Sequence, residues 1–131
     1  MIGLDTNVLV RYLVMDNAAQ GKKASGLIQD SVKNNEELFI NDVVLCELVW
    51  VLESAYDFSK TEISDVLEKL LMTELIIVQN QDEAWLALSD YRSGAADYSD
   101  YFIGRINRSF ECEYTATFDQ ALGTSNLFHK I

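Results

Sequence analysis

The chain opens with Met1-Ile-Gly-Leu-Asp-Thr-Asn7, and this stretch indicates the fold of the whole chain. Residues 2–4 read as a short strand, Asp5 follows at once, and the apolar residues of 6–15 then recur at helical spacing. A strand that ends at an acid and turns directly into a helix is typical of open α/β folds, whose sites lie beyond the carboxyl ends of the strands. Asp5 alone decides nothing, because Asp is also a common helix N-cap.

Length and composition limit the class of protein. A chain of 131 residues that is 49% hydrophobic predicts a single domain, 1–131, with a core of its own. Charged residues interrupt the long apolar stretches, so no membrane span is expected. The start has too few apolar residues, and no basic segment before them, for a secretory signal. Cys46 and Cys112 lack metal-type spacing and indicate reduced core thiols of a cytoplasmic protein.

The net charge of −11 disfavours ordinary electrostatic binding of DNA or RNA, because such a surface repels phosphates at long range. A nucleic-acid function is compatible with this charge if divalent metal neutralises some of the carboxylates. A basic protein partner also fits the charge.

The rest of the chain alternates short strands with helices. After the first strand, we expect strands at 37–41, 74–78 and 113–118, with a last edge strand at 127–128. The expected helices cover residues 6–15, 17–34, 43–56, 59–72, 81–92 and 97–110. This order predicts an α/β fold with a parallel sheet sandwiched by helices. Because parallel strands all end at the same edge, Asp5 and Asp119 are expected at one edge of one sheet.

Three further acids lie between these two strand ends. Glu47 belongs to a helix that is apolar nearly all round, so it should be largely buried, and costly unless it is paired or binds metal. A buried ion pair, or a carboxylate at a gap in the packing, explains Glu47 equally well. Asp97 and Asp100 share one face of a later helix, although acids in a first helical turn usually just face water.

Taken together, these acids can converge on one end of the sheet. Crowded carboxylates repel one another unless a cation lies between them, and Mg²⁺ or Mn²⁺ prefers such oxygen ligands. A metal held in this way can activate water and stabilise the leaving oxygen in phosphodiester cleavage. His129 is the only histidine and lies near the terminus, so neither a His-based triad nor a His zinc site is expected.

The motifs around these acids resemble those of PIN domains. Leu4-Asp-Thr-Asn-Val-Leu9 resembles the family's opening motif, and Glu47, in Cys46-Glu-Leu-Val-Trp-Val-Leu52, resembles its second acid. Asp97-Tyr-Ser-Asp-Tyr-Phe-Ile-Gly104 is similar to the family's D-x-x-D-x-x-I-A segment, with Gly in place of the usual Ala. Thr117-Phe-Asp119 looks like its T-x-D strand end. The resemblance runs over essentially the whole chain, in the right order.

This resemblance implies a three-layer α/β/α sandwich with a central, mainly parallel sheet, and a Mg²⁺-dependent endoribonuclease, with Mn²⁺ as a substitute. In size the chain is similar to the VapC toxins of toxin–antitoxin pairs, which implies an RNA substrate, a homodimer and a VapB-like antitoxin. By that likeness the catalytic acids are Asp5, Glu47, Asp100 and Asp119, the metal ligands include Asp5, Asp97, Asp100 and Asp119, and the positioning residues are Thr6, Asn7 and Thr117. Whether Asp97 or Asp100 is the primary ligand is left open.

The alternative comes from another class of protein, a non-catalytic acidic α/β module. One form is a receiver-like signalling domain, which needs an Asp ending its middle strand and a Lys ending a late strand. Here Val78-Gln-Asn80 ends the middle strand and Asp119 the late one, so the receiver interpretation is poor. The other form is a degenerate PIN domain that only binds a partner, and it stays open although all the expected acids are present.

Overall fold

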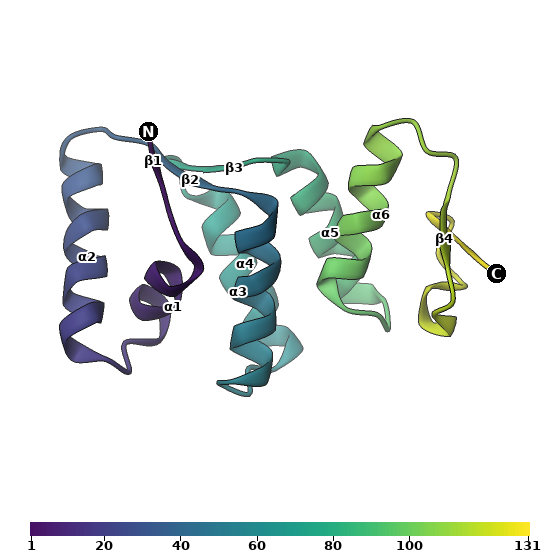
Figure 1. Ribbon diagram of the computed structural model, residues 1–131, viewed down its shortest axis with the longest axis horizontal. Coiled ribbons are helices and arrows are strands. Elements are labelled where there is room, and N and C mark those ends of the chain that lie inside the picture. The colour runs from purple at the N-terminus through teal and green to yellow at the C-terminus, as the bar shows by residue number, and fades with distance from the viewer.

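The computed structural model describes residues 1–131 and contains six α-helices and five short strands, all paired in parallel (Figure 1). This confirms the predicted α/β class. In chain order the elements are β1 (Ile2–Gly3), α1 (Thr6–Val14), α2 (Ala18–Lys33), β2 (Leu38–Ile40), α3 (Asp42–Ser54), α4 (Lys60–Met72), β3 (Ile76–Val78), α5 (Gln81–Ser93), α6 (Tyr98–Ser109), β4 (Thr115–Thr117), the 3-10 helix η1 (Gln120–Leu122) and β5 (Phe128–Lys130).

The first sheet has the strand order β1-β2-β3 and forms part of the core. In β2 and β3 the buried residues alternate along the strand, as the pleat requires. Leu38 and Ile40 of β2 are at most 2% exposed, and Ile76 and Val78 of β3 at most 7%. These strands therefore fix the positions of the residues that come after them, because their side chains are locked among the apolar faces of the neighbouring helices.

Polar side chains start several of the helices. Asp5 accepts a hydrogen bond from the Thr6 N–H at 2.8 Å at the start of α1, and Asn41 does the same for the Val44 N–H at 2.9 Å at the start of α3. The capping box expected of Ser59 at the start of α4 is present, with both of its reciprocal hydrogen bonds. The acid that comes after β1 is thus held at a helix N-terminus.

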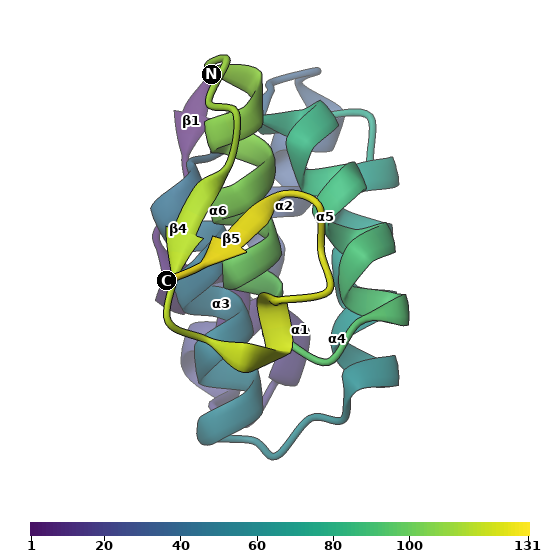
Figure 2. The same ribbon diagram turned by 90° about the vertical axis from the view of Figure 1, so that its right-hand side faces the viewer.

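The second sheet is separate from the first and consists only of β4 and β5. It lies on the far side of α6 from β1 (Figures 1 and 2). Phe128 of β5 packs against Gly104 of α6 so closely that a Cβ there would lie 2.7 Å from its ring. The expectation of one sheet carrying both Asp5 and Asp119 is therefore wrong.

The physical reason lies in the residues of β4. Thr115 and Thr117 are half-buried and Ala116 is exposed, so this strand offers no apolar face for a place between two helical layers. The apolar residues of this region belong to the segment that pairs with it, where Leu127 and Phe128 are buried. The pair consequently covers α6 as a surface layer.

None of the six helices combines the length and the apolar character that a membrane crossing requires.

Candidate functional site

The first group of predicted residues joins α1 to α3. Thr6 is 6% exposed, and its hydroxyl donates a hydrogen bond to Glu47 Oε1 at 3.1 Å. Asp5, directly before it, is exposed and caps α1. Glu47 is therefore brought to the end of β1 and held there by the nearly buried hydroxyl of Thr6.

Glu47 itself is exposed, which corrects the expectation that its helix would bury it. One side of α3 packs into the core through Leu45, Leu48 and Leu52. The opposite side carries Glu47 and Trp50 at helical spacing, and Trp50 is 68% exposed. Apolar residues lie on the exposed side of this helix as well as on its buried side. The apolar composition of the helix therefore did not show that Glu47 is buried.

The second group of predicted residues lies around the start of α6 and the end of β4. Burial raises the pKa of Asp100, the negative charges of Asp97 and Asp119 raise it further, and a backbone hydrogen bond from Asp97 partly offsets the rise. Asp119 is exposed and accepts a hydrogen bond from the Ala121 N–H at 2.8 Å, while its own N–H donates to Thr117 Oγ1 at 3.0 Å. Thr117 thereby orients the backbone of Asp119.

Glu53, at the last turn of α3, also belongs to this second group, although the sequence did not single it out. Burial raises its pKa, and so does the charge of Asp97. The Tyr91 hydroxyl donates to Glu53 Oε1 at 3.3 Å, and the pKa of Tyr91 rises to about 12 through burial and the nearby Glu53 charge. The sequence did contain a signal for Glu53, because it is a second acid in the same apolar helix, six residues after Glu47.

Within this chain the two groups do not meet. No set of three or more His, Cys, Asp or Glu side chains is arranged to hold a metal ion. Asp5 and Glu47 lie with the first sheet, whereas Asp97, Asp100 and Asp119 lie with α6 and the second sheet. The acids therefore lie in two groups, and neither group places three side chains close enough together to hold a metal ion.

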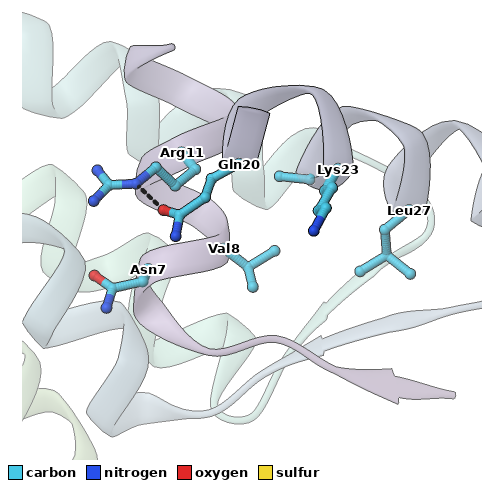
Figure 3. A pocket seen from close by; sticks show the side chains of 7 residues that line it. Asn7, Val8, Arg11, Gln20, Lys23 and Leu27 are labelled. Carbon is cyan, nitrogen blue, oxygen red and sulfur yellow. Dashed lines mark hydrogen bonds between the residues drawn. The ribbon is translucent and has the colours of Figure 1, made fainter. Parts of the chain in front are cut away.

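Asn7 faces a feature that the sequence did not reveal, a cavity of about 310 Å³ between α1 and α2 (Figure 3). Arg11 on its wall is held by Gln20, whose Oε1 accepts from Nε at 2.6 Å, and by Asp16, which pairs with Nη1 at 3.2 Å. The residues that line the cavity are Asn7, Val8, Arg11, Gln20, Lys23, Ala24 and Leu27. Two of them are cations and none is an acid.

The cysteines form no site. Both are free; Cys46 is half-buried, and Cys112 is exposed rather than in the core as expected. Burial and the nearby Asp42 charge raise the pKa of the Cys46 thiol to about 11. This thiol stays protonated at neutral pH and is a poor metal ligand or nucleophile.

The comparison with protein families gives one match, to the PIN domain, over residues 2–122. No curated protein matches the chain. The matched segment includes every acid that the sequence singled out. PIN domains are mostly Mg²⁺-dependent nucleases. Because the match covers residues 2–122 of 131, this chain belongs to the PIN-domain family.

Proposed function

We propose that this protein is a metal-dependent endoribonuclease that cleaves phosphodiester bonds in RNA. The observation that carries the proposal is the hydrogen bond from Thr6 to Glu47, which holds a second carboxylate at the strand end where Asp5 lies. The hydrogen bond satisfies the nearly buried Thr6 hydroxyl, and it also fixes the direction of a carboxylate that could otherwise turn freely in water. The contact therefore orients Glu47 toward the strand end that carries Asp5.

The acids around α6 supply the second support. Asp100 keeps its proton to higher pH than an ordinary Asp, because it is partly buried and lies near Asp97 and Asp119. A cation placed among these side chains would remove that repulsion and favour the ionised forms. Mg²⁺, where bound by PIN domains, supplies activation of water and stabilisation of the leaving oxygen.

The roles of the chain's own residues follow from their positions. Asp5, Glu47, Asp100 and Asp119 provide the negative charge of the centre. Thr6 fixes the carboxylate of Glu47, and Thr117 fixes the backbone of Asp119. Asn7 is exposed on the first turn of α1 and faces the cationic cavity, where its amide can donate to an RNA phosphate.

We further propose that the protein is the toxin of a VapBC-type pair, is inhibited by a VapB-like antitoxin and acts as a homodimer. The net charge of −11 and the exposed acids support a basic inhibitory segment, because opposite charge speeds association and favours such a partner. One observation favours a different function. The separation of the acids within a chain fits a PIN domain that only binds a partner.

The test is cleavage of a mixed RNA pool by the purified protein with Mg²⁺, with Mn²⁺ and with EDTA. We expect metal-dependent cleavage that Asp5→Asn and Asp100→Asn abolish without loss of thermal stability. Asp65→Asn is the matched control, because it removes the same charge from an exposed position of α4. Absence of cleavage by folded wild-type protein with either metal would favour the binding module instead.

A further inference from the structure

The indole ring of Trp50 is the largest apolar side chain that this protein leaves in water. The residue is 68% exposed, and the ring–ring and cation–π contacts within the chain do not involve it. A single exposed apolar residue is ordinary on a protein surface. The position of the ring, rather than its exposure alone, therefore carries the argument.

Trp50 lies midway between two acids of the same helix. Glu47 precedes it by three residues, and Glu53 follows it by three. Three residues turn an α-helix by about 60° less than a full turn and advance it by about 4.5 Å. The three side chains consequently form one oblique row along α3, with the indole at its centre.

The two ends of this row belong to the two groups of acids. At one end, Glu47 accepts the hydrogen bond from Thr6 at the end of β1. At the other end, Glu53 is close enough to Asp97 for that negative charge to raise the pKa of Glu53. α3 itself contacts α1 on one side and α6 on the other (Figure 1). A strand that runs along α3 from one group to the other therefore passes over the ring of Trp50.

The charge of α3 limits how it can bind a nucleic acid. Residues 42–54 include three acids and no Lys or Arg. The side chains of this helix therefore offer no cation to phosphates, which usually supply much of the affinity for RNA. The bases are uncharged, and every base has a π face that can stack on an aromatic ring. Stacking on Trp50 is thus the main attraction that this helix can offer to RNA.

We infer that Trp50 is a base-stacking residue: an unpaired RNA base lies on its indole ring, and the phosphates on either side of that base face the acids at the two ends of the row. The inference rests on the proposed function, under which the acids hold metal that offsets the repulsion of phosphates. The occupant is a single strand, because a base inside a duplex is already covered on both faces by its neighbours.

The first test measures binding with Ca²⁺ in place of Mg²⁺, by the fluorescence anisotropy of a labelled single-stranded RNA of mixed sequence and about 12 nucleotides, a length within the site sizes of single-strand binders. We expect Trp50→Ala to raise the dissociation constant at least about fivefold, because stacking of one base contributes that much or more. Trp50→Phe keeps a ring and should lose less. Trp50→Leu is apolar without a ring and should lose as much as Trp50→Ala.

Phe110→Ala is the matched control. Phe110 is also an exposed aromatic residue, at 75%, but it lies at the opposite end of α6 from Asp97. This variant should bind the RNA as the wild-type protein does. An equal loss in Phe110→Ala and Trp50→Ala would overturn the inference, because any exposed ring would then suffice.

Two further measurements separate stacking from attraction to phosphates. An abasic backbone of the same length should bind the wild-type protein at least about fivefold more weakly, and Trp50→Ala should remove most of that difference. The logarithm of the dissociation constant should rise with the logarithm of the salt concentration with a slope below about 1.4, which corresponds to about two phosphates. A steeper slope together with equal binding of both probes would overturn the inference.

The second test measures kcat and KM for RNA cleavage with Mg²⁺. We expect KM to rise in Trp50→Ala while kcat changes little, because stacking holds the substrate and the transition state alike. A fall in kcat with unchanged KM would contradict a role in binding the strand. Thermal unfolding of the variant should match that of the wild-type protein.

The outcomes separate this inference from the proposed function. Wild-type protein that binds the strand without cleaving it refutes the nuclease, and the binding measurements then decide on Trp50. Active wild-type protein whose KM and dissociation constant are unchanged in Trp50→Ala overturns the stacking and leaves the nuclease intact. Wild-type protein that binds no strand overturns the stacking as well. So does a change in the sedimentation of RNA-free protein in Trp50→Ala, because the ring would then belong to a contact between copies.

Discussion

The two parallel sheets of this protein are built from different residues. In the first, β2 and β3 alternate large aliphatic side chains that are at most 7% exposed, such as Ile40 and Val78. In the second, β4 reads Thr115-Ala-Thr117, with every residue half-buried or exposed. The first sheet is part of the core, and the second is a layer fastened onto α6 by its neighbour's apolar residues.

Because of this contrast, the candidate acids differ in how firmly they are held. Asp5 and Glu47 are positioned by elements that cannot move without opening the core. Asp119 is positioned by a surface layer whose local opening should need less free energy than global unfolding. A site made from both groups therefore joins a rigid part to a movable one.

The largest expected effect tests the first sheet. Ile40→Ala removes a side chain that is 0% exposed at the centre of that sheet. We expect it to lower the free energy of unfolding by about 2–5 kcal/mol, because the cavity cannot close fully. Urea unfolding measures this. The control, Val43→Ala, truncates a residue that is 68% exposed, and an equal loss there would contradict the contrast between core and surface.

The next effect tests where the second sheet lies. A Cβ at Gly104 would come 2.7 Å from the Phe128 ring, so Gly104→Ala forces the layer off α6. The helix gains about 1 kcal/mol from alanine, but overpacking removes about 1–3 kcal/mol, so we expect a net loss. Hydrogen exchange should quicken at 113–131 and stay unchanged in β2 and β3.

Gly26→Ala provides the control for that experiment. Gly26 lies within α2, where an added Cβ meets nothing within 4 Å. This variant should stabilise the protein by up to about 1 kcal/mol. If Gly104→Ala stabilises the protein to the same extent, β5 does not cover that face of α6 in solution.

A smaller effect compares the starts of two helices. Ser59 caps α4 with both hydrogen bonds of a capping box, whereas Asp97 starts α6 without a side-chain cap bond. Ser59→Ala should lower the free energy of unfolding by about 1 kcal/mol, and Asp97→Ala by clearly less. Thermal unfolding of the two variants side by side gives the answer, and equal losses would show that Asp97 caps its helix after all.

The smallest effect concerns pH. The charge of Asp97 helps to raise the pKa values of Asp100 and Glu53, so Asp97→Asn should lower both, as NMR titration would show. An acid whose pKa is raised in the folded state stabilises that state fully at pH values below its pKa in the unfolded chain, which is 3.8 for Asp100 and 4.5 for Glu53. This stability is lost as the pH rises through the pKa of the folded state. The free energy of unfolding of Asp97→Asn should therefore fall less between acid and neutral pH than that of the wild-type protein.

We expect that difference to stay below about 0.5 kcal/mol, because these groups are largely solvated. Asp65→Asn should leave both pKa values where they are. Unchanged pKa values in Asp97→Asn would mean that the acids around α6 do not interact.

Much of the fold could be predicted because local patterns determine it. The apolar periodicity between residues 6 and 109 gives all six helices, and the capping box at Ser59 gives one boundary directly. The pairing of β4 could not be predicted, because alternation of strands and helices indicates parallel strands but does not say which sheet each one joins. Only the packing of Phe128 on Gly104 decides that.

The sequence supplied candidate site residues, which stay a prediction, but not their geometry. The spacing of motifs identified Asp5, Glu47 and Asp119, yet it could not show that Glu47 is exposed. That outcome depends on which side of α3 the neighbouring helices cover. The cavity beside Asn7 left no local signal either, because its walls come from two helices whose contact is tertiary.

The exposed Trp50 gives this molecule a built-in optical reporter. Its indole is already in water beside Glu47, whereas Trp85 is half-buried against the core. Unfolding therefore changes mainly the emission of Trp85. Emission from Trp50 should shift to the blue only when another molecule covers that side of α3. Tryptophan fluorescence can thus distinguish occupation of the acidic centre from loss of the fold in one sample.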